Sequence, residues 1–222
     1  MSSAVIQLIV LAGIAVFLIL RLKNVLGTRE GFEKPAVPVA ADAAGRGRTA
    51  RDFEVIEGGK DADILDHVAE GSSAALALAE MKRAEPSFHV GDFLRGARGA
   101  YEMILMAFER GDLDPVLPYL SRDVYDAFLE VVEQRERDGL KITSNFVGIR
   151  EIVLVDAEFN ETTREGEVKM RFLGELNFTV RNAAGEIVEG NPNTIKSQRD
   201  IWTFARRMGV DDPNWQLVAT DE

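Results

Sequence analysis

The order of hydrophobic and polar positions divides the chain into three parts. Between Ala4 and Leu20 apolar residues follow one another almost without interruption. From about residue 27 to residue 63 neither a helical nor a strand period lasts for long, and beyond residue 63 a helical period gives way to an alternating one. The pattern predicts a membrane anchor at 1–26, a flexible linker at 27–63 and one globular domain at 64–222.

The first apolar run is long enough to cross a bilayer. At about 1.5 Å of rise per residue, about 17 to 19 residues approach the hydrocarbon thickness of about 30 Å. Basic residues follow the run and none precedes it, so the positive-inside rule predicts a single-pass inner-membrane protein with its domain in the cytoplasm. The residues expected to form the anchor include Val5, Leu8, Leu11, Phe17, Leu20, Arg21 and Lys23.

Two other interpretations of this run are weaker. A cleaved signal peptide needs a basic region before the apolar run and a small-residue cleavage site directly after it. Here the nearest such site, Ala41-Asp42-Ala43, lies about twenty residues too far on. A buried globular helix would be expected to carry polar residues, and none interrupts Leu8 to Leu20.

The first half of the domain shows helical periodicity. Helices are expected at 64–84, with a weak point at Gly71-Ser72-Ser73, at 88–110, and at 121–137 with Ser121 as N-cap. The small residues of the second helix would let a sheet approach closely; they are Gly96, Ala97, Gly99 and Ala100.

The second half alternates with a period of two. Strands are expected at 146–159, bulged near Gly148, at 167–180, bent at Gly174, at 197–206 and at 215–220. A poorer strand should run toward Gly190 and be broken by Asn191-Pro192-Asn193. Helices followed by antiparallel strands predict an α+β domain with its helices gathered on one face of a curved sheet.

The net charge and the types of side chain present argue against several classes of function. The net charge is −11, and Met1–Asp63 hold eight basic and eight acidic residues, so the excess belongs to the domain. Such a surface repels phosphate backbones, which argues against nucleic-acid binding. Cysteine is absent, the two histidines are His67 and His89, and no hydrolase or metal motif occurs, so neither cofactor nor metal is expected. An acid–base site would be sought at Tyr101, Tyr125 and Asp200.

Three separated blocks resemble a known family. They are Phe93–Asp112, Leu120–Phe128, and Asp200–Phe204 together with Asp212–Thr220, and they resemble the Tim44-like domain. Its bacterial members, called TimA, carry an N-terminal membrane segment. The resemblance covers about 64–220 and implies a sheet cupped around helices, related to the NTF2-like cone, with a large apolar groove. Mitochondrial members are adaptors that recruit an Hsp70 chaperone beside a translocation channel, through contacts that include a long charged N-terminal region different from the segment here.

These observations lead to one expected function and two alternatives. We expect a non-enzymatic adaptor that binds protein partners at the inner membrane, with translocation components or an Hsp70 chaperone as candidates, and that contacts lipid through its anchor. The alternatives are a cone that binds lipid or a small molecule, and a hydratase or isomerase. The oligomeric state stays open. Aromatic residues are expected to line the partner groove, namely Tyr101, Phe108, Phe128, Trp202 and Trp215.

Overall fold

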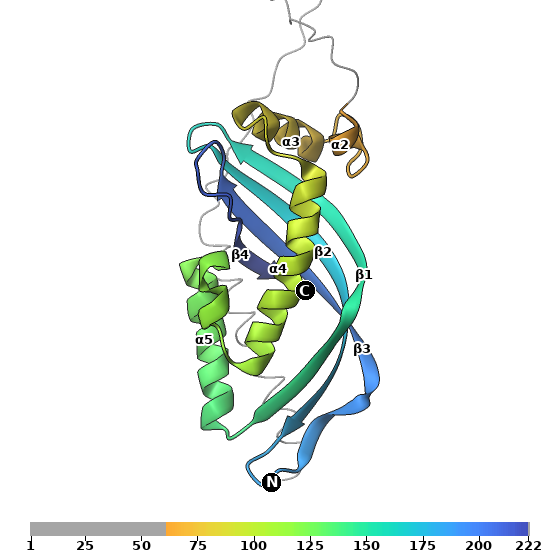
Figure 1. The fold of residues 1–222 in the computed structure, drawn as a ribbon, viewed down its shortest axis with the longest axis vertical. Coiled ribbons are helices and arrows are strands. Elements are labelled where there is room, and N and C mark those ends of the chain that lie inside the picture. Colours follow the sequence, from red (N-terminus) through yellow and green to blue (C-terminus); the bar gives the residue numbers. More distant parts are fainter. Residues whose placement is uncertain (1–60, 222) are drawn as a thin grey trace, which may run out of the picture. The chain divides into compact units, whose positions relative to one another are not determined.

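The computed structural model describes residues 61–221 (Figure 1). The predicted anchor and all but the last three residues of the predicted linker lie outside these residues. Within 61–221, no helix combines the length and the hydrophobicity that crossing a bilayer requires.

The helical half contains four α-helices and one 3-10 helix among the described residues. They are α2 (Ala62–Leu65), α3 (Ser73–Ala84), α4 (Val90–Arg110), the 3-10 helix η2 (Asp114–Tyr119) and α5 (Arg122–Arg137). The helix expected over 64–84 is interrupted at its predicted weak point, where Gly71 adopts a φ of 74°, although the first piece, α2, already ends at Leu65. Ser72 then begins a new helix by accepting a hydrogen bond from the Ala75 N–H.

The ends of the two longer helices follow the local sequence. Gly111 adopts a left-handed conformation, with a φ of 73°, and ends α4. The Ser121 hydroxyl accepts a hydrogen bond from the Val124 N–H, which confirms it as the N-cap of α5.

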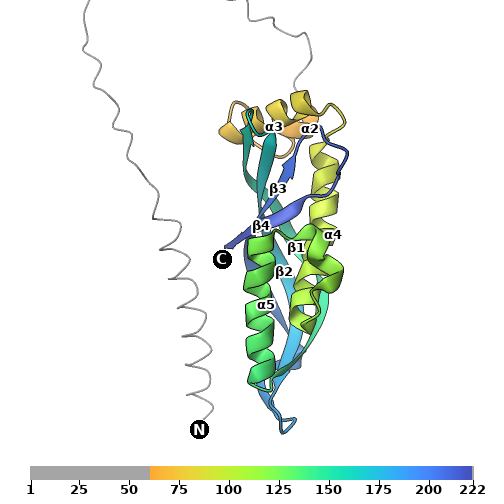
Figure 2. The same ribbon diagram turned by 90° about the vertical axis from the view of Figure 1, so that its left-hand side faces the viewer.

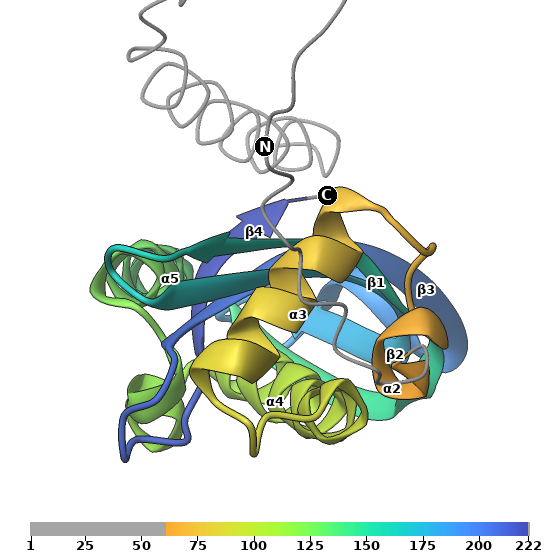
Figure 3. The same cartoon turned by 90° about the horizontal axis from the view of Figure 1, so that it is seen from above.

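Four antiparallel strands form one sheet in the order β1-β2-β3-β4. Their bounds are Lys141–Asn160, Glu165–Arg181, Ile187–Arg207 and Gln216–Asp221. The sheet curves around α4, and α3 crosses it near the β1–β2 turn (Figures 1 and 3). The predicted α+β arrangement is confirmed, with its helices packed on one antiparallel sheet.

Bulges in β1 supply part of this curvature. The pairing register with β2 shifts at three places, which leaves Val147, Arg150 and Val155 without a direct partner. A bulge bends its strand and increases the local twist. The bulge predicted near Gly148 is therefore confirmed, and two more follow it along β1.

The predicted break at Asn191-Pro192-Asn193 was wrong in its consequence. β3 continues through this segment. Asn191 pairs with Phe178 and Lys196 pairs with Leu176, so the four residues between them, 192–195, have no partner on β2. Pro192 cannot donate a ladder hydrogen bond, so it is tolerated where the strand leaves its neighbour.

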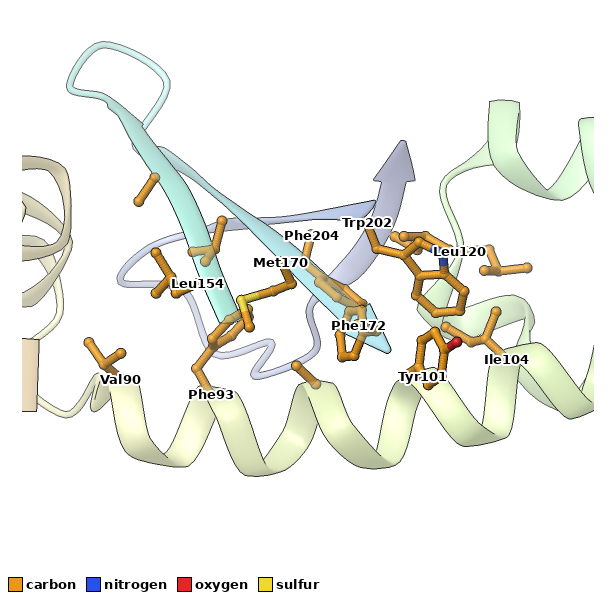
Figure 4. Packing of buried hydrophobic residues seen from close by; sticks show 14 of the residues in the cluster. Val90, Phe93, Tyr101, Ile104, Leu120, Leu154, Met170, Phe172, Trp202 and Phe204 are labelled. Carbon is orange, nitrogen blue, oxygen red and sulfur yellow. The ribbon is translucent and has the colours of Figure 1, made fainter. Parts of the chain in front are cut away.

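The core lies between α4 and the sheet (Figure 4). Strand β2 contributes Val168, Met170 and Phe172, which are fully buried, while Lys169 and Arg171 point to the other face. The alternation predicted for β2 is thus confirmed. From here on, the side of the sheet that faces α4 is called the inner face and the opposite side the outer face.

The close approach predicted at the glycines of α4 was wrong, and Gly174 of β2 has a role that was not predicted. Gly96 and Gly99 are exposed, and a Cβ at either would meet nothing within 4 Å, so they do not permit close approach of the sheet. Gly174 does have a steric role. A Cβ there would lie 2.5 Å from the Tyr101 hydroxyl, so its lack of a side chain makes room for Tyr101.

Candidate functional site

The two ends of the inner face differ in how they are closed. Near the β3–β4 turn, Trp215 packs against Phe93, with ring centroids 4.7 Å apart, and against Phe88 at 5.8 Å. We call this region, together with the ion pairs formed by Asp63, Lys82, Glu85 and Arg206, the clamped end.

A buried ion pair secures the clamped end. Arg206 Nη2 donates to Glu85 Oε1 at 2.7 Å, and the Gly209 N–H donates to Glu85 Oε2 at 2.8 Å. The guanidinium also lies over the Trp215 ring, 5.3 Å from its centroid. Burial opposes ionisation of Glu85, but Arg206 and the Gly209 N–H outweigh it and lower the pKa of Glu85. The pair joins the α3–α4 connection to the end of β3.

Asp63 makes a second set of polar contacts at the clamped end, to the start of α4 and to Lys82 of α3. Its carboxylate accepts hydrogen bonds from the Val90 N–H at 2.8 Å and the Gly91 N–H at 2.9 Å, and Lys82 Nζ lies 2.8 Å away. A residue 27 positions earlier therefore caps α4, whose N-cap residue His89 makes no side-chain cap hydrogen bond. Burial would raise the pKa of Asp63, but Lys82 and the two N–H groups lower it to about 2.

Midway along the inner face, Tyr101 meets Asp200. The buried Tyr101 hydroxyl donates to Asp200 Oδ2 at 2.5 Å, and Gln198 Nε2 donates to Oδ1 and Oδ2 at 3.0 and 3.1 Å. Burial, together with Asp200, raises the pKa of Tyr101 well above its ordinary value. Tyr101 therefore stays protonated and acts as a donor inside the core. Asp200 itself is half-buried.

Beyond this pair, half-buried phenylalanine side chains lie on the inner face and on the helices beside it. Phe108 of α4 contacts Phe128 of α5, with ring centroids 4.7 Å apart, while Phe146 and Phe178 come from β1 and β2. We call these four residues the open end. Figure 2 shows α5 running beside α4 in this part of the domain.

Charged groups surround the open end. Arg135 lies over Phe108, 4.3 Å from the ring centroid, and donates to the Phe108 carbonyl at 3.2 Å. Burial lowers the pKa of Arg135, although Glu109 and Glu189 oppose that shift. Lys196 lies over Phe178, 5.0 Å from the ring centroid. Both cations are therefore engaged with aromatic rings.

The five aromatic residues expected to line a groove are distributed over the whole inner face. Tyr101 and Trp202 are buried in the core between α4 and the sheet, with ring centroids 4.8 Å apart. Phe108 and Phe128 belong to the open end, whereas Trp215 belongs to the clamped end. Whether any of them contacts a partner stays a prediction.

The three residues considered for acid–base chemistry are only partly brought together. Tyr101 and Asp200 are hydrogen-bonded, but Tyr125 is half-buried on α5 and no hydrogen bond or ring contact among the described residues joins it to them. His67 and His89 are exposed. Within 61–221, no three or more acidic or histidine side chains are grouped so that they could hold a metal ion.

Sequence reasoning did not single out Phe146, Phe178 and Gln198. Each occupies an inward position of its strand, so the alternation of β1, β2 and β3 could have identified them once the inward face was known. Arg135 gave no such signal, because a cation near the end of a helix is ordinarily solvated.

Two hollows among residues 61–221 lie on the outer face. One of about 360 Å³ is lined by Glu158, Phe159, Asn160, Glu165 and Glu167, and a neighbouring one of about 370 Å³ shares Glu158 and Glu167. Their lining is largely charged, unlike the large apolar groove that the resemblance implied. Burial, and then Glu165 and Glu158, raise the pKa of Glu167.

Comparison with known proteins gives a consistent set of matches. The model of the Tim44-like domain matches residues 74–222. The mitochondrial import inner membrane translocase subunit TIM44 of Homo sapiens is 25% identical over 163 residues, which are 72% of this chain and 35% of the human protein. TIM44-1 of Arabidopsis thaliana is 22% identical over 164 residues, covering 70% of this chain and 34% of that protein. The chain thus spans about a third of the length of these curated relatives.

A search of solved structures gives a weaker likeness. The intermembrane space region of the chloroplast protein ARC6 superposes with a TM-score of 0.40 at 9% identity, over 58% of this chain and 94% of that one. A likeness at this level carries no argument about function.

Proposed function

We propose, on the premise that this chain belongs to the Tim44-like domain family, that it is a non-enzymatic adaptor whose domain binds partner proteins through the open end of its inner face. The relatives are named as subunits of a mitochondrial import translocase, so a role in protein transport is the most direct extension to this chain. Translocation components or an Hsp70 chaperone are the partners that such a role would require.

The observation that carries the proposal is the contrast in burial along the inner face. Phe108, Phe128, Phe146 and Phe178 come from four different elements and are only half-buried, whereas Phe88 and Phe93 of the clamped end are buried. Large apolar side chains that stay partly exposed are typical of surfaces that bind protein.

The proposed location follows from the sequence before the domain. We propose that residues 1–26 anchor a TimA-type bacterial protein in the inner membrane, with the domain at the cytoplasmic face. The apolar run and the basic residues after it support this topology. The linker would keep the domain close to membrane-bound partners without fixing its orientation.

The arrangement of Tyr101 and Asp200 supports a role without catalysis. The Tyr101 hydroxyl is fully buried and already donates to Asp200, so it presents no proton to a substrate. A general acid or base must come within hydrogen-bond reach of a reacting group. The pair is better explained as part of the support for the inner face.

Quantitative proteomics of the tagged full-length protein, purified from mildly solubilised native membranes, tests the proposal. A matched protein has Met1–Lys23 replaced by an unrelated membrane anchor. We expect a translocation or chaperone component to be recovered specifically with both proteins, because the domain supplies the contact.

A control variant separates the face from the rest of the domain. Phe178→Ser at the open end should abolish recovery of the partner, whereas Ile201→Ser on the outer face should leave it unchanged. Recovery of only lipid or a small molecule with both anchors would contradict the adaptor role and favour a ligand-binding cone.

A further inference from the structure

Asp200 is a half-buried anion without a cationic partner among the described residues. Its hydrogen-bond donors are the neutral groups of Tyr101 and Gln198, and no lysine, arginine or histidine of residues 61–221 forms an ion pair with it. A partly buried carboxylate is ordinarily paired, because removing charge from water costs free energy.

The cations that share the inner face are held elsewhere. Lys196 is on the same strand and face as Asp200, but it lies four positions earlier, which corresponds to about 13 Å along the strand. Its ammonium lies over the Phe178 ring. Arg135 lies over Phe108 and donates to that residue's carbonyl. Neither neutralises Asp200.

The carboxylate is also fixed in position. Tyr101, which donates to it, stacks on Phe172 with ring centroids 4.4 Å apart, and its hydroxyl occupies the space above Gly174. Asp200 is the cross-strand neighbour of Phe172, so it projects from the inner face. A group held in this way loses little conformational entropy when it binds a ligand.

We propose that Asp200 recognises the lysine or arginine side chain of an apolar polypeptide segment bound across the open end. This inference rests on the proposed function and names the chemistry of the partner. The basic side chain would bind Asp200 in a charge-assisted hydrogen bond, and the apolar remainder would cover Phe146 and Phe178. The excess of acidic residues in the domain favours approach of a basic segment.

A polypeptide fits this surface better than a small free amine does. The four phenylalanines of the open end come from α4, α5, β1 and β2, so the apolar area extends over several elements. A free amine would contact Asp200 and leave most of that area in water. The apolar burial that drives association requires a larger partner.

Peptide binding to the full-length protein in lipid nanodiscs tests the inference. One fluorescent probe is a short peptide of leucine and serine with a single central lysine, and its twin has norleucine in place of the lysine. We expect the lysine peptide to bind the native protein about tenfold more tightly than its twin, as a charge-assisted hydrogen bond implies. In Asp200→Asn this preference should disappear while the norleucine peptide binds as before.

Asp156→Asn is the matched control, since Asp156 is a half-buried aspartate at an outer-face position of the same sheet. It should leave the lysine preference intact, and circular dichroism checks that both variants are folded. Equal binding of the two peptides to the native protein would overturn the role of Asp200 while leaving the adaptor proposal standing. Binding of neither peptide would overturn this inference, while recovery of a partner in the proteomics would still decide the adaptor proposal. Binding of butylamine without binding of either peptide would overturn the polypeptide as occupant.

Discussion

The clamped end and the open end of the inner face use similar aromatic residues in different settings. At the clamped end, Phe88 and Phe93 are buried and pack against Trp215, and the Arg206–Glu85 pair joins the surrounding segments. At the open end, Phe128 and Phe178 remain half-buried, and single cations lie over the rings without closing them off. Stability and binding are therefore expected to reside in different parts of one sheet.

Breaking the clamp should have the largest effect on stability. Glu85→Gln would leave the buried Arg206 guanidinium opposite a neutral amide, and we expect a loss of about 3 kcal/mol in the free energy of unfolding. Denaturant unfolding measures this loss. Glu80→Gln in the neighbouring helix α3 breaks only a surface pair with Arg83 and should cost less than about 1 kcal/mol. Equal losses in the two variants would contradict the clamp.

Removing the hydroxyl of Tyr101 should have the next largest effect. Tyr101→Phe deprives Asp200 of a buried donor, and we expect a loss of about 2 kcal/mol in thermal or denaturant unfolding. Tyr125→Phe is the control, because its hydroxyl makes no hydrogen bond among the described residues, and it should cost less than about 0.5 kcal/mol. If the two variants were equally stable, the Tyr101–Asp200 bond would contribute nothing to the fold.

The remote cap at Asp63 should contribute less and depend on pH. Asp63→Ala should cost about 1 kcal/mol at neutral pH. Since the native pKa of about 2 lies below the ordinary 3.8, this contribution is present above about pH 4 and is lost as the pH falls toward 2. The difference in unfolding free energy between the native protein and Asp63→Ala should shrink over that window. Asp66→Ala, at an exposed neighbouring position, should cost less than Asp63→Ala at neutral pH.

The smallest expected effect is a gain in stability on the outer face. Glu158 and Glu167 are direct cross-strand partners of like charge, and burial together with Glu165 and Glu158 raises the pKa of Glu167. Glu167→Gln should therefore stabilise the domain by about 0.5 kcal/mol at neutral pH. The gain should fade as acid protonates Glu167 in the native protein. Glu175→Gln breaks a surface contact with Arg150 and should bring no gain.

The sequence predicted those features that local chemistry determines. The alternation of Val168, Met170 and Phe172 located the inner face of β2, and Ser121 and Gly111 marked helix ends, because each acts on neighbouring residues. The cap supplied by Asp63 could not be predicted in this way, since its partners Val90 and Gly91 are far along the chain.

The candidate site was predicted less completely than the fold. Tyr101 and Asp200 were named separately, but only tertiary packing brings α4 against β3 and forms their hydrogen bond. The same packing buries Tyr101 and Trp202 and leaves Phe178 partly exposed, although all three are aromatic. How deeply such a ring is buried depends on contacts between residues far apart in the chain, and the periodicity of the sequence does not predict those contacts.

Site-specific photocrosslinking in native membranes tests the central claim most directly. Benzoylphenylalanine would replace Phe178 at the open end of the full-length protein or, as the control, Ile201 on the outer face. The account predicts defined polypeptide adducts at position 178, fewer of them in a protein that also carries Asp200→Asn, and none at position 201. Equal adducts at both positions, or adducts of lipid alone at position 178, would contradict a partner-binding open end.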